Sequence, residues 1–212
     1  MLYNIRRLKS KSGFTLVELI VVIAIIGVLA AILIPTMISY TVQAQVTSAN
    51  TTAAKIQKSI SAFLVEADVD GYGFKLAAGN YCHGEITVTN SQWTITITEG
   101  DLSNVFYAKN ISWQGSGSGK AGDSRVTTCA EQLLAIVLAD SLPEIETAKL
   151  GFRLESGTCR ACYYVPGFNG TITAPPFGSG GWSAKNFAWN GNENGICAEG
   201  YVVGTAPAIT IN

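Results

Sequence analysis

The sequence predicts an α+β fold, in which a long N-terminal helix packs on an antiparallel β-sheet and a loop-rich C-terminal region follows. Three observations lead to this prediction. An almost uncharged apolar run fills residues 14–34. Apolar residues then continue at helical spacing as far as Ala67. Further on, β-branched or aromatic residues alternate with threonines, a pattern typical of strands with one packed and one wet face.

The apolar run is long enough to cross a membrane. Its 21 residues make a helix of about 31 Å, close to the thickness of the hydrocarbon core of a bilayer. Four basic residues precede it (Arg6, Arg7, Lys9 and Lys11), so the N-terminus is expected in the cytoplasm and the chain beyond residue 35 outside. An ordinary secretory signal has a shorter apolar region of about 7–15 residues.

Glu18 is the one charge inside this run. A carboxylate within a membrane span costs about 2.5–3.5 kcal/mol unless it is paired or close to the interface. No basic residue follows it in the span, so the available cation is the amine that a cut before Phe14 would create. That amine can belong to the same chain or to a neighbouring copy. A plain single-span anchor leaves the placement of Glu18 unexplained.

The segment from Lys11 to Leu19, KSGFTLVEL, resembles the class III signal of type IV pilins and their pseudopilin relatives. In that family a short basic leader ends in glycine, and a membrane prepilin peptidase cuts after it and methylates the new N-terminal phenylalanine. The resemblance implies that residues 1–13 are a leader, that cleavage falls between Gly13 and Phe14, and that the amine of Phe14 is methylated.

The same resemblance assigns a role to Glu18, which would neutralise the N-terminus of a neighbouring subunit, Phe14, during filament assembly. Gly27 and Pro35 match a glycine and a proline of the family and are the expected kink positions of the helix. The implied architecture is the type IV pilin fold, with residues 14–35 as the transmembrane and filament-core helix.

Residues 36–67 form the predicted amphipathic second half of this helix. The apolar positions are Ile38, Val42, Val46, Ala49, Ala53, Ile56, Ile60, Phe63 and Ala67. The expected polar face carries Gln43, Gln45, Asn50, Lys55, Gln57, Lys58 and Ser61. Such a stripe needs a sheet to cover it. Residues 68–212, the predicted β-rich exported head, are expected to supply this sheet.

Within the head, strands are predicted at residues 85–89, 92–98, 105–113, 149–155, 160–165, 201–203 and 208–211, and a short buried helix at residues 129–140. The glycine- and serine-rich stretch 115–122 is predicted to be a flexible linker or a long surface loop. Residues 166–194 are expected to be irregular.

The five cysteines lie in the exported part, where disulfides are favoured: Cys82, Cys129, Cys159, Cys162 and Cys197. Their odd number leaves at least one free, intermolecular or bound to a metal. The expected bridges join the hairpin of Cys159 and Cys162 to Cys197 and to Cys129 or Cys82. The alternative is a structural zinc site of thiolates, built on the same CxxC motif with Cys197 or Cys129, and His83 beside Cys82 offers a mixed variant of it.

Trp182, Phe187 and Trp189 cluster in the glycine-rich region and form either a binding surface for sugars or proteins, or anchors that fix the region to the sheet. Without the leader, 10 Lys and Arg stand against 15 Asp and Glu, a net charge of −5 that gives no signal for nucleic-acid binding. One histidine and no phosphate-binding motif give no basis for an enzyme, and no cofactor is expected.

The function implied by the resemblance is that of a structural subunit of a type IV pilus, which serves adhesion, motility or DNA uptake. Its partners would be other pilin subunits, the prepilin peptidase, the assembly machinery and the membrane, and its surface ligand is not indicated. Before assembly it would reside in the cytoplasmic membrane, and afterwards in a surface filament. The alternatives are a pseudopilin or minor pilin of a type II secretion or competence system, and a membrane-anchored binding module.

Overall fold

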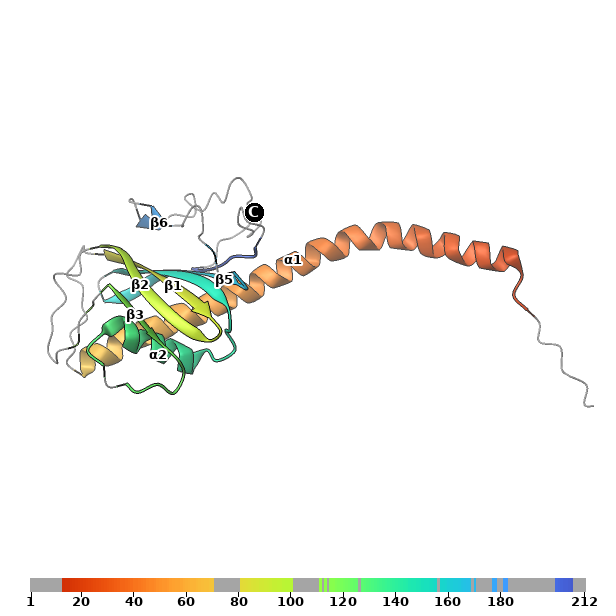
Figure 1. Cartoon of the computed structure of the whole chain (residues 1–212). Coiled ribbons are helices and arrows are strands. Elements are labelled where there is room, and N and C mark those ends of the chain that lie inside the picture. The colour runs from red at the N-terminus through yellow and green to blue at the C-terminus, as the bar shows by residue number, and fades with distance from the viewer. Residues whose placement is uncertain are drawn as a thin grey trace, which may run out of the picture. The chain divides into compact units, whose positions relative to one another are not determined.

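The structure of the chain is a computed structural model, shown in Figure 1. It describes residues 13–70, 81–100, 111, 113, 115–125, 127–155, 157–168, 170, 177–178, 181–182 and 201–207. The long helix α1 (Leu16–Val69) comes first, and the other helices and strands that the structure describes lie beyond residue 80. The chain divides into two compact units, Met1–Val42 and Gln43–Asn212.

The described part of the first unit is the start of α1, and its apolar side chains are exposed on every side. Between Phe14 and Ile34 the large hydrophobic side chains are between 46% (Val22) and 83% (Phe14) exposed. The helix is long and apolar enough to cross a membrane and continues through Pro35. An apolar surface of this extent requires a bilayer or other helices around it.

Threonine hydroxyls along the middle of α1 bond to the helix itself. Each donates to a backbone carbonyl three or four residues earlier, at oxygen–oxygen distances of 2.8–3.2 Å. The five residues are Thr36, Thr41, Thr47, Thr51 and Thr52. These hydroxyls therefore need no donor or acceptor outside the helix.

The second unit begins with the apolar stripe of α1, which is confirmed from Val46 onward. The buried positions are Val46, Ala49, Ala53, Ile56, Ile60, Phe63, Leu64 and Ala67. Ile38 and Val42 were predicted to belong to the stripe, but Ile38 is 60% exposed and Val42 is only partly buried. Leu64 joins the stripe because a helix face wide enough to pack on a sheet includes neighbouring positions.

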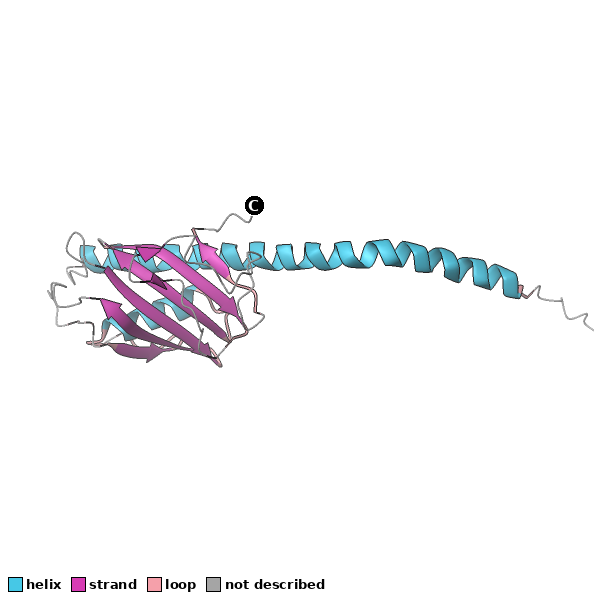
Figure 2. Ribbon diagram, turned by 90° about the horizontal axis from the view of Figure 1, so that it is seen from above, coloured by secondary structure: helices cyan, strands magenta, loops and turns pink. Residues whose placement is uncertain are grey.

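A six-stranded antiparallel sheet covers this stripe, with the strand order β3-β2-β1-β4-β5-β8. Its strands are β1 (Tyr81–Thr89), β2 (Gln92–Gly100), β3 (Ser116–Gly119), β4 (Ala148–Glu155), β5 (Thr158–Pro166) and β8 (Gly204–Ala206). Phe177–Gly178 (β6) and Gly181–Trp182 (β7) form a separate two-stranded ribbon. Both helices lie on one face of the large sheet (Figure 2).

The predicted alternation in β2 is confirmed. Trp93 and Ile95 are buried on the helix side, whereas Thr94 is partly buried and Thr96 is exposed. β1 and β2 form a hairpin whose turn residues Asn90 and Ser91 both have positive φ, as the favoured two-residue turns require. The sheet is not a plain meander, since β1 also pairs with β4.

Helix α2 (Ala130–Ser141) returns the chain from β3 at one edge of the sheet to β4 beside β1. The prediction that residues 115–122 are a flexible linker or surface loop is wrong, because β3 lies within them and pairs with β2. A Cβ at Gly117 would lie 2.4 Å from the backbone nitrogen of Gln132 in α2. The glycines of this stretch therefore permit a close approach of strand and helix.

Polar side chains of α1 bind the last strands of the sheet. The Thr205 N–H donates to Asn50 Oδ1 (2.7 Å), and Gln57 Nε2 donates to the carbonyl oxygens of Cys159 (3.1 Å) and Arg160 (3.0 Å). The Cys159 N–H donates to Ser61 Oγ (3.3 Å). The prediction that Asn50, Gln57 and Ser61 lie on a polar outer face is wrong. These residues flank the apolar stripe and form hydrogen bonds with backbone groups of the strands.

β8 contacts the backbone of α1 directly. A Cβ at Gly204 would lie 2.1 Å from both the carbonyl carbon and the carbonyl oxygen of Ala49. Backbone atoms on both sides cannot move aside as a side chain can, so only glycine fits at this crossing.

Four cysteines lie in or beside this core. Burial raises the pKa of the Cys82 and Cys159 thiols to about 12 and that of Cys162 well above its ordinary value. Burial also raises the pKa of the Cys129 thiol, and a hydrogen bond from this thiol to Glu131 Oε2 (3.1 Å) adds to the shift.

Replacing Gly204 by alanine tests the crossing of β8 and α1. We expect Gly204→Ala to lower the free energy of unfolding by about 1–3 kcal/mol, because the added methyl group overpacks a buried contact. The measurement is urea unfolding of the full-length chain in detergent, followed by tryptophan fluorescence. Ser118→Ala, at an exposed strand position, is the control and should change it by less than about 0.5 kcal/mol. Equal stability of Gly204→Ala and the parent chain contradicts the assignment.

The thiols are expected to resist alkylation in the folded chain. At pH 8 a thiol with a pKa of about 12 is ionised about a thousandfold less than one at its ordinary value of 9.0. Iodoacetamide should therefore modify Cys82, Cys159 and Cys162 only after denaturation, as read by mass spectrometry of tryptic peptides. Labelling of Cys82 or Cys159 in the native chain at the rate of a free thiol is the contrary result.

Candidate functional site

The start of α1 holds the residues that the sequence singled out for processing and assembly. Thr15 precedes the first helical residue, and Glu18 is the third residue of the helix. The Thr15 N–H and the Thr15 hydroxyl donate to Glu18 Oε2, at 2.8 and 2.7 Å. The Glu18 N–H lies 3.3 Å from Thr15 Oγ1 and donates to it.

These reciprocal bonds form a capping box. Its two side chains satisfy backbone donors that the first turn of a helix leaves without partners, and the carboxylate also lies favourably at the positive end of the helix dipole. The box gives Glu18 a partner within its own chain, namely Thr15. The cost of a carboxylate at the edge of an apolar span is therefore partly offset before any second subunit arrives.

Only one of the two carboxylate oxygens of Glu18 is used in the capping box. Both bonds from Thr15 end on Oε2, and Oε1 accepts no hydrogen bond from any residue that the structure describes. Because a carboxylate accepts about four hydrogen bonds, Glu18 retains capacity for an external cation.

Gly13 and Phe14 precede the helix, and both are exposed. Phe14 is 83% exposed, and a Cβ at Gly13 would have no atom within 4 Å. Within the described part of the chain, no atoms block access to the peptide bond between these two residues. Gly27 and Pro35 lie within α1, and their predicted role as kinks stays a prediction.

The four described cysteines are free and buried, and Cys197 lies outside the described residues. The predicted bridges from Cys159 or Cys162 to Cys82 or Cys129 are therefore wrong. Leu154 of β4 pairs with both Cys82 and Cys159, so these cysteines are two strands, or about 9.6 Å, apart. A disulfide needs Cα atoms within about 7 Å.

Cys129 lies at the start of α2, where its Sγ is 3.6 Å from the carbonyl oxygen of Ser116 in β3. β3 is at the opposite side of the sheet from β5, so Cys129 is far from the CxxC motif. His83 follows Cys82 in β1, and successive strand residues point to opposite faces. In the described parts of the chain, no group of three His, Cys, Asp or Glu side chains is placed to hold a metal ion.

The aromatic surface predicted from Trp182, Phe187 and Trp189 lies largely outside the described residues. The backbone of Trp182 is in β7, where it pairs with Phe177, and Phe187 and Trp189 are not described. Phe168, which the same region contains, is buried and contacts the ring of Tyr201 at a centroid distance of 4.7 Å.

The role of Thr15 was missed in the sequence analysis, although the signal was present. Threonine followed three residues later by glutamate, directly before an apolar helical run, is the sequence signature of a capping box. Glu18 was predicted to pair with the amine of Phe14, and its hydrogen bonds with Thr15 were not predicted.

Comparisons with known proteins agree with the resemblance of the chain to type IV pilins. Residues 8–34 match the family described as the prokaryotic N-terminal methylation motif. A fimbrial protein of Moraxella nonliquefaciens is 34% identical over 112 residues, which cover 50% of this chain and 70% of that protein. No solved structure is significantly similar to the chain.

Two further relatives are matched over a smaller part of their length. A fimbrial protein of Pseudomonas aeruginosa is 34% identical over 95 residues, which make up 45% of this chain and 54% of that protein. The type IV major pilin protein PilE of Neisseria gonorrhoeae is 29% identical over 109 residues, 48% of this chain and 65% of that protein.

Residues 16–34 of the methylation motif lie in α1, where the apolar side chains are exposed, and the later part of α1 packs on an antiparallel sheet. The similarity spans more than two thirds of a fimbrial protein. The chain is therefore a member of the type IV pilin family.

Proposed function

We propose that this protein is the structural subunit of a type IV pilus, made as a membrane-stored precursor and assembled through the N-terminal half of α1. The main support for this proposal is the arrangement of residues at the start of α1. There a glutamate with one unengaged carboxylate oxygen stands four residues from Phe14, at the head of an apolar helix exposed on all sides.

In this proposal the prepilin peptidase cuts between Gly13 and Phe14 and the new amine of Phe14 is methylated. The exposed segment around this bond and the match to the methylation motif support the assignment. Cleavage also removes the basic leader, which would otherwise place four positive charges among the packed helices of a filament.

The Phe14 amine of one subunit then pairs with Glu18 of a neighbour. Oε2 of Glu18 stays in the capping box with Thr15, and Oε1 accepts the incoming ammonium group. A buried carboxylate and a buried amine are each costly alone, and their pairing offsets both costs. The apolar side chains between Phe14 and Ile34 exchange lipid for the helices of other subunits as the filament grows.

The filament would serve adhesion, motility or DNA uptake. A pseudopilin or minor pilin of a type II secretion or competence system would have the same helix and the same processing. The relatives are named fimbrial protein and type IV major pilin, which favours a surface filament over that alternative. The assembly machinery and the peptidase are the implied partners.

Mass spectrometry of the N-terminal peptide tests processing and location together. Material sheared from the cell surface should contain a peptide that begins with N-methylated Phe14, because both the cut and the methylation precede assembly in this proposal. Processed chain confined to the membrane fraction favours the pseudopilin alternative. An intact leader in both fractions contradicts both and leaves a membrane-anchored binding module.

Two variants separate the external role of Glu18 from its role in the capping box. Glu18→Gln keeps an acceptor for Thr15 but removes the charge, whereas Thr15→Val keeps the charge and removes the capping hydroxyl. We expect normal processing of both, and a fall in sheared fibre yield of at least about tenfold for Glu18→Gln, since an unpaired buried amine costs about 3–5 kcal/mol.

Thr15→Val should lose only the cap, about 1 kcal/mol of local helix stability, and still form fibres. Fibre yield is read by quantitative immunoblotting of sheared material against total cellular protein. Normal yield from Glu18→Gln, or an equal loss from both variants, would show that pairing with Phe14 is not the function of Glu18.

A further inference from the structure

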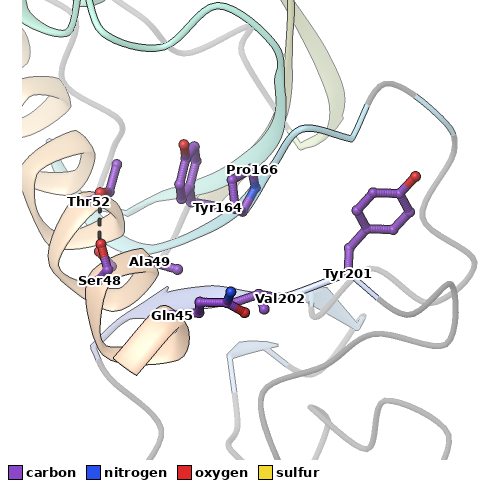
Figure 3. Close-up of a pocket in the computed structure, with 8 residues that line it drawn as sticks. All are labelled: Gln45, Ser48, Ala49, Thr52, Tyr164, Pro166, Tyr201 and Val202. Atoms are coloured by element: carbon purple, nitrogen blue, oxygen red, sulfur yellow. Dashed lines mark hydrogen bonds between the residues drawn. The ribbon is translucent and has the colours of Figure 1, made fainter. Parts of the chain in front are cut away.

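A pocket of about 470 Å³ opens in the second unit, between α1 and the β5–β8 side of the sheet (Figure 3). From α1 it is lined by Gln45, Ser48 and Thr52, and from the sheet side by Tyr164 and Pro166 of β5 and by Tyr201. Its volume falls in the range of about 300–1,000 Å³ that is usual for small-ligand sites.

Three neutral polar groups in this pocket are not used by the fold. No hydrogen bond to another described residue engages the amide of Gln45, the hydroxyl of Ser48 or the phenol of Tyr164. The Thr52 hydroxyl donates to the Ser48 carbonyl oxygen at 3.2 Å and keeps its acceptor capacity. The pocket thus offers several donors and acceptors at one place.

The rings of Tyr164 and Pro166 lie side by side at this pocket. Tyr164 packs against the buried core cluster and lines the pocket, so its ring is held in position from behind. The pyrrolidine ring of Pro166 lies beside it in the same strand, and Tyr201 is supported by its contact with Phe168. A rigid ring combined with adjacent polar groups matches a ligand that has both apolar faces and hydroxyl groups.

The electrostatic surroundings that the structure describes favour a neutral ligand over an anionic one. No charged side chain is among the described residues that line the pocket. Burial raises the pKa of Tyr164, and the negative charge of nearby Glu144 raises it further. The chain without its leader also carries a net charge of −5, so an acidic ligand would be repelled.

We propose that this pocket binds a neutral saccharide unit, with Tyr164 and Pro166 against the apolar face of a sugar ring and Gln45 and Ser48 bonded to its hydroxyl groups. This activity is additional to the filament role and does not depend on it, because every lining residue belongs to one chain. In a filament, many copies of a weak site would act together and raise the avidity for a polysaccharide surface.

Saturation-transfer NMR on the full-length, unassembled chain tests the proposal. The chain is held in lauryldimethylamine oxide, whose head group is not a sugar, and the probes are lactose, maltotriose and N,N′-diacetylchitobiose, with 3′-sialyllactose as the acidic comparison. At least one neutral probe should bind with a dissociation constant on the order of 1 mM, and sialyllactose should bind more weakly than lactose.

Variants on the exposed face of α1 locate the site without disturbing the core. Gln45→Ala should weaken binding roughly three- to tenfold, the value of one or two hydrogen bonds, and Ser48→Trp should abolish it by filling the space. Gln43→Ala is the matched control, since Gln43 is an exposed glutamine of the same helix that does not line the pocket, and its binding should be unchanged.

Three results overturn the proposal. One is the absence of binding by every neutral probe up to about 10 mM. Another is equal binding by Ser48→Trp and the parent chain, which places the sugar elsewhere. The third combines two measurements: the parent chain binds no sugar, and Ser48→Trp forms fewer fibres than the parent chain. That result would mean that the pocket is a contact between subunits. None of them bears on the processing of Phe14 or on the pairing of Glu18.

Discussion

The apolar surface between Phe14 and Ile34 is the constraint on which the rest of the chain depends. Nothing in the described chain covers it, so this part of α1 is stable only within a bilayer or among other helices. The capping box follows from the same constraint. In such surroundings, unsatisfied donors at the start of a helix are costly, and Thr15 and Glu18 satisfy them locally.

The remainder of α1 has a different structural role, because it forms part of the folded domain that contains the sheet. Ala49 and Ala53 bring the helix axis close to the sheet, and Gly204 lets β8 touch the helix backbone. Asn50 and Gln57 then satisfy strand groups at the flanks of the apolar stripe. The helix therefore contributes both apolar contacts and specific hydrogen bonds to the domain.

Much of this arrangement could be predicted from the sequence wherever a local periodicity carries the information. The apolar period of α1, the alternation Trp93-Thr94-Ile95-Thr96 and the apolar content of α2 each depend on neighbours along the chain, and each was confirmed. The position of α2, the pairing of β1 with β4 and the orientation of Asn50 and Gln57 depend on contacts distant in sequence, which no local pattern specifies.

Two errors have instructive physical causes. The glycine- and serine-rich composition of residues 115–122 resembled that of flexible linkers, yet Gly117 and Gly119 recur with the period of a strand and face α2. Disulfides were predicted because the cysteines lie in the exported part of the chain, and this prediction did not take into account how far apart the cysteines lie across the sheet. Cys82 and Cys159 are separated by β4, and no preference of the environment for oxidation overcomes that distance.

The threonines of α1 have a consequence for the movement of a subunit between environments. Because the hydroxyls of Thr36, Thr41, Thr47, Thr51 and Thr52 already donate to the helix, they lose no hydrogen bond to a protein partner when the surroundings change. Their methyl groups are compatible with lipid, and their remaining lone pairs with water. These threonine side chains are thus nearly indifferent to the polarity around them, and around the exposed Thr36 and Thr41 a membrane surface can shift along the helix without a hydroxyl group losing its hydrogen-bond acceptor.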